Sequence, residues 1–327
     1  MEPDIRKNVV NTMKSVMKNR ISLFLLISLT FYLPVVFAGA QCDQDGIWLQ
    51  VLGSGGPEVQ DKRASSSYLI WVDGKARIMV DAGGSAGLRF GESGAAFRDL
   101  YTILFTHMHV DHTAALPVLI KSAFFENRQN DLVILGPKGN DRMPSTSEFL
   151  ASMFSSDHGA YRYLGSHLTK EDNGDWKIIC RDLDYLPAKP NALKKVQSVD
   201  NGISIQSIPV NHGPIPAIAW RVDINDLSIT FSGDTSNQWD TLEKLAKNTD
   251  ILVAHNAIPE GTTGVGRRLH MPPSEIGKIA NNAQVKHLIL SHRMMRTLGR
   301  EEKTIGIIKE KYKGRISFAN DLDCFKP

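Results

Sequence analysis

The sequence predicts an α/β protein in which two mixed β-sheets pack together and helices flank them, an αββα sandwich. After residue 40, short apolar runs first alternate with glycine-bearing turns, which is typical of antiparallel strands. Later apolar runs alternate with helical segments, as parallel strands do. The composition is that of a globular protein, with 42% hydrophobic and 22% charged residues. Residues 41–327 are therefore expected to form one domain with a substantial core.

The individual elements follow from local patterns. Asp73-Gly74 between two apolar runs is a strong hairpin signal, and Ser145 marks the start of a helix. The expected strands and hairpins are residues 47–52, 67–72, 76–80, 101–105, 132–135, 196–210, 217–231, 251–254, 287–290 and 316–319. The expected helices are residues 114–125, 145–154, 237–247, 273–283 and 303–311. The polar stretch from about 155 to 195 fits neither pattern and is expected to be an inserted lobe or lid.

Residues 1–40 are predicted to be a secretory signal peptide. Five basic residues come first: Arg6, Lys7, Lys14, Lys18 and Arg20. An apolar run at 21–37 and the small residues 38–40 follow, which completes the three-part layout of such a signal. Cleavage after Ala40 would give a periplasmic or secreted protein with no stable membrane anchor. An uncleaved anchor is the alternative, and Met13 or Met17 could be the true start.

The cysteines and the net charge bear on disulfide formation and on nucleic-acid binding. Export exposes Cys42, Cys180 and Cys324 to an oxidising compartment, where one disulfide can form and one thiol is left over. The sequence does not determine the pairing, and no cysteine lies beside a histidine cluster. The net charge is +3, and much of this excess precedes Ile21. Charge therefore gives no argument for nucleic-acid binding, and no nucleic-acid partner is expected.

The segment Thr106-His107-Met108-His109-Val110-Asp111-His112 carries the strongest functional signal. It follows an apolar strand and precedes a helix, so its side chains can converge where the chain turns. Imidazole and carboxylate groups are ligands of zinc, and manganese and iron are alternatives. Three histidines and one aspartate are more than a single ion would use. We therefore expect two divalent ions, with zinc as the first choice.

These residues resemble the metallo-β-lactamase superfamily, and most closely its ribonuclease Z-like branch. Further matches are Leu52-Gly53-Ser54-Gly55-Gly56-Pro57, Arg63 with Ser65-Ser66-Ser67, and Val80-Asp81-Ala82-Gly83. The resemblance covers nearly all of residues 41–327 and implies the αββα fold of that superfamily. It also implies that Asp81 supports the metal-binding loop without being a ligand.

The resemblance supplies the remaining metal ligands residue by residue. His212, Asp234 and His292 each follow an apolar run in the order that the family has them. The implied ligands of the first ion are His107, His109, His212 and Asp234. Those of the second ion are Asp111, His112, His292 and the shared Asp234. Asp111 would also orient the attacking water.

His270 is the candidate catalytic histidine near the leaving group, because the branch has a histidine at this point. The alternative is a residue that merely flanks a helix. One departure concerns the stretch His255-Asn256-Ala257-Ile258, where ribonuclease Z usually has His-Glu-Ala-Thr. Because Asn256 cannot carry the charge of a glutamate, this departure argues against transfer-RNA processing.

Within this branch, export and motifs favour the arylsulfatase-type subgroup, so the first expectation is hydrolysis of a sulfuric ester. The substrate would be a small anionic ester, and Tyr161 and Tyr163 could face its aryl ring or simply pack in a lid. The alternatives are a phosphodiesterase, a lactonase or thioesterase, ribonuclease Z-like RNA processing, and a metal-binding module without turnover. A homodimer is compatible with the sequence, but no pattern in it decides this.

Overall fold

A computed structural model describes residues 42, 45–168, 176–186, 194–199 and 202–327. The predicted signal peptide lies outside the described residues, as does part of the polar stretch 155–195. Every described residue belongs to one compact unit, Gly39–Pro327. No described helix is both long enough and apolar enough to span a membrane.

Two mixed sheets form the centre of this unit, each with seven strands among the described residues. Across the first sheet the order is β14 (Cys324–Phe325), β1 (Ile47–Gly53), β2 (Ser67–Val72), β3 (Lys75–Ala82), β4 (Thr102–Leu104), β5 (Leu132–Pro137) and β6 (Ile178–Leu183). Across the second it is β13 (Arg315–Phe318), β12 (His287–Ser291), β11 (Ile251–His255), β10 (Leu227–Phe231), β9 (Ile218–Ile224), β8 (Ile203–Pro209) and β7 (Lys194–Val199).

Each sheet is antiparallel in one part and parallel in the other. Strands β14 to β3 are antiparallel neighbours, and β3 to β6 run parallel. In the second sheet β7 to β10 are antiparallel, and β10 to β13 run parallel. Parallel neighbours need crossover connections, which the helices between them supply. The predicted order of meanders followed by helix-linked strands is therefore confirmed.

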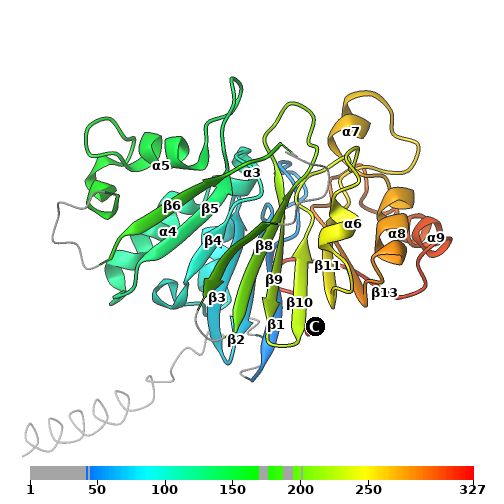
Figure 1. Ribbon diagram of the computed structural model, residues 1–327, viewed down its shortest axis with the longest axis horizontal. Helices are drawn as coiled ribbons and strands as arrows, with labels where there is room; N and C mark the ends of the chain where they lie inside the picture. Colours follow the sequence, from blue (N-terminus) through cyan, green and yellow to red (C-terminus); the bar gives the residue numbers. More distant parts are fainter. Residues whose placement is uncertain (1–41, 43–44, 169–175, 187–193, 200–201) are drawn as a thin grey trace, which may run out of the picture. The chain divides into compact units, whose positions relative to one another are not determined.

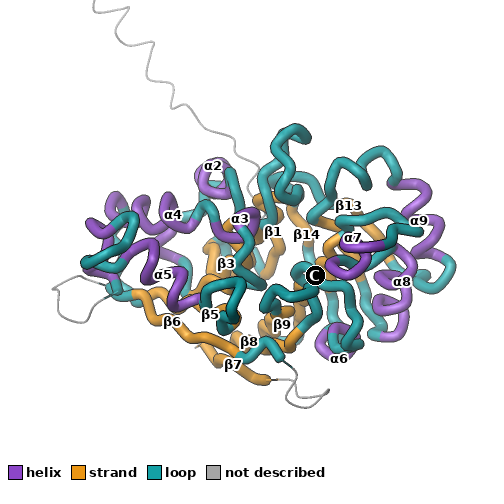
Figure 2. Tube along the Cα trace, turned by 90° about the horizontal axis from the view of Figure 1, so that it is seen from above, coloured by secondary structure: helices purple, strands orange, loops and turns teal. Residues whose placement is uncertain are grey.

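Three apolar layers hold the unit together. The layer between the sheets includes Tyr68, Trp220 and Phe231, all essentially inaccessible to solvent. The outer face of the first sheet is covered by α2 (Ala86–Glu92), α4 (Leu116–Ser122) and α5 (Thr146–Phe154). The outer face of the second is covered by α6 (Leu242–Leu245), α8 (Pro273–Asn282) and α9 (Glu301–Lys309). Figures 1 and 2 show these helices on opposite sides of the strands. The predicted αββα fold class is confirmed.

Some element boundaries differ from prediction for local reasons. The expected helix at 237–247 is reduced to α6, because Asn237 and Asp240 have φ angles of 58° and 48°, which a right-handed helix excludes. The expected helix at 114–125 consists of α4 followed by the 3₁₀ turn η2 (Ala123–Phe125), and the short helix α3 (Val110–Thr113) precedes it. The polar stretch contributes the 3₁₀ helix η3 (Arg162–His167) and the edge strand β6, neither of which was expected. Two further elements are η1 (Phe97–Asp99) and α7 (Gly264–Leu269).

A disulfide joins Cys42 to Cys324, with their Cα atoms 5.6 Å apart, and Cys180 is free. It fixes the pairing that the sequence left open. Beside it, the Asp321 carboxylate accepts hydrogen bonds from the backbone N–H groups of Ser54 (3.1 Å) and Ala64 (2.8 Å). The C-terminal segment is thereby tied to loops at the end of β1 and before β2.

Candidate metal centre

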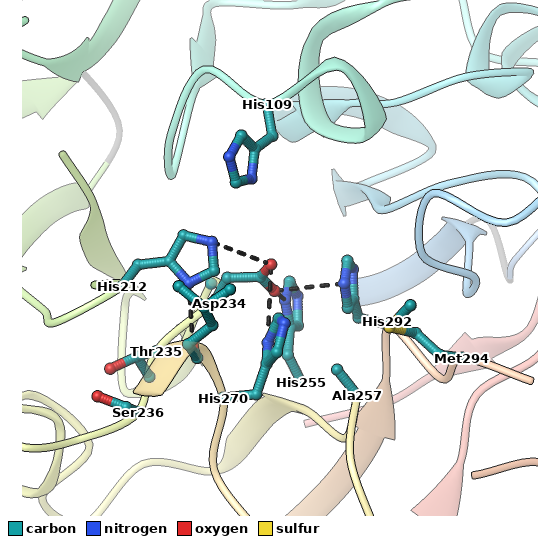
Figure 3. A network of polar contacts seen from close by, with 12 residues as sticks. His109, His212, Asp234, Thr235, Ser236, His255, Ala257, His270, His292 and Met294 are labelled. Atoms are coloured by element: carbon teal, nitrogen blue, oxygen red, sulfur yellow. Dashed lines mark hydrogen bonds and ion pairs between the residues drawn. The ribbon is translucent and has the colours of Figure 1, made fainter. Parts of the chain in front are cut away.

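The predicted ligands lie just beyond the ends of buried strands. His107, His109, Asp111 and His112 follow β4, His212 follows β8, Asp234 follows β10 and His292 follows β12. The carboxyl ends of neighbouring parallel strands meet at one edge of a sheet, where side chains in the following loops can converge. Figure 3 shows Asp234 at the centre, with His212 on one side and His292 on the other. Every one of the seven predicted ligands is brought to this edge.

Two groups of side chains have the spacing that a metal ion needs. In each group, the ligand atoms all lie within 4.8 Å of one another. The first group is His107, His109, His212 and Asp234; the second is His112, Asp234, His255 and His292. Asp234 belongs to both, with Oδ2 3.6 Å from His212 Nε2 and Oδ1 3.4 Å from His292 Nε2. The first group has the membership that the family resemblance implied.

Asp111 also lies at the second group, although it is not among the four most tightly clustered side chains. Its Oδ2 is 3.5 Å from His112 Nε2 and 3.9 Å from His292 Nε2. The carboxylate is only 8% exposed. Asp111 therefore lies beside the second group, where the family resemblance leads us to expect it.

The donor set fits divalent cations. The Nε2 atoms of His112 and His212 are buried and have no hydrogen-bond partner among the described residues. A buried polar atom without a partner costs free energy, and a cation at that point would remove the cost. The opposite nitrogens are held: Nδ1 of His212 donates to the carbonyl of Leu269 (2.9 Å). Such contacts orient a metal-binding imidazole and fix its tautomer.

Asp81 holds the histidine segment in place. Its carboxylate accepts hydrogen bonds from the backbone N–H of Thr106 (2.8 Å) and the Thr106 hydroxyl (2.9 Å). It also lies 2.7 Å from His112 Nδ1. Asp81 is fully buried at the end of β3. It thus fixes one ligand and the start of the loop that carries the others.

Burial and charge set the protonation of the cluster. Burial, reinforced by neighbouring histidines, holds the pKa values of His107 and His292 well below the ordinary range. Burial alone would raise the pKa of Asp234, but His292, His270 and other histidines hold it well below its usual value. These three groups are therefore in the forms that bind metal. His112 differs: Asp81 and Asp111 outweigh burial and raise its pKa to about 10. A cation bound to Nε2 would have to displace a proton there.

His255 is a residue of this centre to which the sequence gave no role. Its Nδ1 is 2.8 Å from Asp234 Oδ1, and its Nε2 is 3.1 Å from the hydroxyl of Tyr68. Its ring stacks on that of His292, with centroids 4.7 Å apart. His255 ends the apolar strand β11, as the predicted ligands end theirs. This signal, a histidine at the end of an apolar run, could have identified His255 from the sequence.

His270 reaches the centre from the end of α7. Its Nδ1 lies 3.8 Å from Asp234 Oδ2 and is buried without a hydrogen-bond partner among the described residues. Burial is the main reason that its pKa falls to about 4.

Asn256 is also buried, and neither polar atom of its side chain has a hydrogen-bond partner among the described residues. Tyr161 and Tyr163, considered from the sequence as contacts for an aryl ring, have other neighbours: Tyr161 faces Phe154, and the Tyr163 ring contacts Lys121.

The sequence comparisons agree with this fold. The profile of the family described as the β-lactamase superfamily domain matches residues 76–293, so the chain belongs to that family. The chain is 27% identical to "Ribonuclease Z" of Mycobacterium bovis over 291 residues, which cover 84% of this chain and 96% of the relative. Its fold and paired clusters are those of a metal-dependent hydrolase.

Solved structures resemble the fold. Human tRNase Z, short form, superposes with a TM-score of 0.65 at 17% identity, covering 85% of this chain and 98% of that one. Zn²⁺-bound PqqB from Methylobacterium extorquens gives 0.62 at 14% identity, covering 86% and 100%. The relatives named as ribonucleases contradict one expectation, that nucleic acid is excluded. Net charge was a poor guide to nucleic-acid binding, because the charge summed over the whole chain does not give the charge around one site.

Proposed function

We propose that the protein is a metal-dependent phosphodiester hydrolase that cleaves RNA, with two zinc ions as its cofactors. The observation that carries this proposal is the sharing of Asp234 by two buried His/Asp groups. The relatives over 84% of the chain are named ribonuclease Z, which favours a phosphodiester over a sulfuric ester. Imidazole and carboxylate donors suit zinc, which the similar PqqB structure contains.

Each side chain has a distinct task in this proposal. His107, His109 and His212 would hold the first ion, Asp111, His112 and His292 would hold the second, and Asp234 would belong to both sets of ligands. Cations bound there would lower the pKa of a water molecule and neutralise charge on the non-bridging oxygens of the ester. Asp111 accepts a hydrogen bond that orients the water. His270 donates a hydrogen bond to the leaving oxygen, because its unpartnered Nδ1 faces the cluster.

Arginines near the site support an anionic substrate. Arg267 and Arg268 lie in the last turn of α7, shortly before His270, and Arg296 lies four residues after His292. The Nη1 atom of Arg267 donates to the carbonyl of Ser236 (2.9 Å). Within the described part of the chain, none of the three arginines forms an ion pair with a carboxylate. Their charges thus remain available to phosphate oxygens.

The test compares four substrates with purified, zinc-loaded protein: a single-stranded RNA oligonucleotide, the matching DNA, bis-p-nitrophenyl phosphate and p-nitrophenyl sulfate. We expect cleavage of RNA and of the phosphate diester, and little turnover of the sulfate. Asp234→Ala is the matched control and should lose both metal and activity. A clear preference for the sulfate would instead support an arylsulfatase. Retained hydrolysis by the Asp234→Ala variant would contradict the two-metal proposal.

We further propose that the protein is exported. The basic, apolar and small-residue segments before Gln41 support this, as does the Cys42–Cys324 disulfide, since such bonds persist mainly in oxidising compartments. Mass spectrometry of the protein from fractionated native cells should find a mature chain that begins at Gln41. An intact, reduced chain in the cytoplasmic fraction would contradict export.

A further inference from the structure

A pocket of about 400 Å³ opens beside the candidate metal centre. Its walls come from four separated loop segments and include Arg142, Tyr185, Gly213 and Trp239. Gly213 directly follows His212, which belongs to the first metal group. A volume of this size falls in the range of about 300–1,000 Å³ that small-molecule sites occupy.

Hydrogen bonds fix these walls relative to His212. The Asn140 side chain donates through Nδ2 to the carbonyl of Pro214 (2.9 Å), which joins the loop after β5 to the loop after His212. On the other side, the N–H of Ser236 (2.7 Å) and the hydroxyl of Thr235 (3.1 Å) donate to the carbonyl of Asn211. The loop that carries Trp239 is thereby attached to the residue just before His212. Figure 1 shows the loop before α5 and the loop after β8 at the same end of the strands.

The chemistry of the lining suits a nucleobase. Trp239 and Tyr185 are half-buried, so each keeps ring surface against which a flat ring can stack. Stacking on aromatic side chains tolerates any base, because every base presents a π-face. Asp141 and Arg142 are exposed at the same pocket and offer acceptors and donors to a base edge. Neither forms an ion pair with another described residue.

We propose that this pocket is the subsite that receives the nucleobase next to the scissile phosphodiester. This inference rests on the proposed phosphodiesterase function and names the part of the substrate that the protein grips. Trp239 supplies the stacking surface, and Arg142 contacts the base edge or the adjoining phosphate. The subsite determines which diesters bind well and leaves the chemical step to the metal centre.

The test uses two diesters with the same leaving group: thymidine 5′-(p-nitrophenyl phosphate) and methyl p-nitrophenyl phosphate. Trp239→Ala should raise KM for the nucleoside diester about 10-fold, as loss of a base-stacking contact does. Its kinetics on the methyl diester should stay within about twofold, because that ester has no base to stack. Tyr101→Ala is the control, since Tyr101 lines a pocket at the opposite strand ends with Lys75 and Arg77. Equal effects of Trp239→Ala on both diesters, or no effect on either, would overturn the subsite.

A binding measurement separates the subsite from the proposed function. Thymidine 5′-monophosphate should quench the tryptophan fluorescence of zinc-loaded protein, and Trp239→Ala should abolish that quenching. Quenching without hydrolysis of either diester would leave the subsite standing and reject the phosphodiesterase. Hydrolysis of both diesters with the same KM, and no quenching, would reject the subsite and leave the function standing.

Discussion

His255 differs from the other histidines of the metal centre because both of its ring nitrogens already have protein partners. Asp234 takes one and the Tyr68 hydroxyl the other, and Tyr68 in turn donates to the Ser291 hydroxyl (2.9 Å). A metal ligand needs a free lone pair, so the geometry makes His255 a positioning residue for Asp234. Its bond to Oδ1 fixes how the shared carboxylate faces the two groups.

His255→Phe should therefore weaken metal binding about 10- to 100-fold, the usual cost of losing a contact that orients a ligand. The substitution keeps the ring that stacks on His292 and removes the hydrogen bond to Asp234. Competition with a chromophoric chelator measures the affinity. Tyr68→Phe is the matched control and should have the smaller effect, because it leaves the His255–Asp234 bond in place. Unchanged affinity in His255→Phe would contradict the positioning role.

His270→Ala should separate chemistry from metal binding. His270 lies 3.8 Å from Asp234 and is absent from both metal groups, so its loss should leave about two ions per chain. Turnover of a phosphodiester should fall about 100-fold or more, since a side chain positioned to share or transfer a proton at the leaving oxygen contributes roughly 10²–10⁴ to the rate. Steady-state kinetics and elemental analysis of one preparation give both values. A normal rate would return His270 to a helix-flanking role.

At the scale of elements, β12 carries a buried histidine that is unrelated to the metal centre. His287 pairs with Arg315 of β13, and its Nε2 is 2.9 Å from the Ser317 hydroxyl. Burial, helped by the charge of Arg315, lowers its pKa to about 4. Between about pH 6.5 and 4 the unfolded chain binds a proton at this residue and the folded chain does not. Stability should therefore fall as the pH falls through this window.

The prediction is that His287→Gln loses part of this pH dependence. Glutamine can keep a hydrogen bond to Ser317 and does not titrate. The difference in unfolding free energy between pH 7.5 and pH 4 should shrink by up to about 3 kcal/mol, from 1.36 kcal/mol per pKa unit. Denaturant titrations at both pH values measure it, with the exposed His158→Gln as control. Equal pH dependence in wild type and His287→Gln would show that the β12–β13 pairing does not depend on this residue's protonation.

Elements were predictable where the local pattern agreed with the tertiary fold. The runs 251–254 of β11 and 288–290 of β12 are apolar because parallel strands are covered on both faces. The helix at 237–247 was wrong over its first half, because Asn237 and Asp240 have positive φ angles and the Thr241 hydroxyl donates to the carbonyl of Pro209. β14 is only two residues long and depends on pairing with β1, nearly three hundred residues earlier. No local pattern can indicate such a partner.

At the scale of the whole molecule, the two metal groups join both sheets. His107 and His112 follow a strand of the first sheet, whereas strands of the second sheet precede His212, Asp234 and His292. Ions that bind only the folded state stabilise it by about 2.7 kcal/mol at one hundred times Kd. Metal binding should therefore hold the two halves of the sandwich together as well as serve catalysis.

Removal of metal should consequently destabilise the entire unit. A chelator is expected to lower Tm by about 5 °C or more, and added zinc should restore it. Differential scanning calorimetry checks both steps. Asp234→Ala should start from the lower Tm and respond little to the chelator. A chelator-resistant Tm in metal-loaded wild type would mean that the ions contribute nothing to the fold.

The site was more predictable than the arrangement around it. The segment from His107 to His112 follows one apolar run, and His212, Asp234 and His292 each follow another, so this signal and the family order pointed to all seven residues. His255 carried the same signal but has no fixed role in the resemblance. The nucleobase pocket could not be predicted, because Arg142, Tyr185 and Trp239 become neighbours only through the folded loops. The cysteine pairing likewise depends on where the chain ends meet in space.

The Cys42–Cys324 bond turns almost the whole unit into a covalent ring. A protease that cuts one exposed loop inside the ring leaves two fragments still linked through sulfur. Such a nicked molecule would migrate as one species without reductant and separate only after reduction. A circularly permuted chain could have its new ends in a loop far from the metal centre, because the Cys42–Cys324 disulfide already links the original ends.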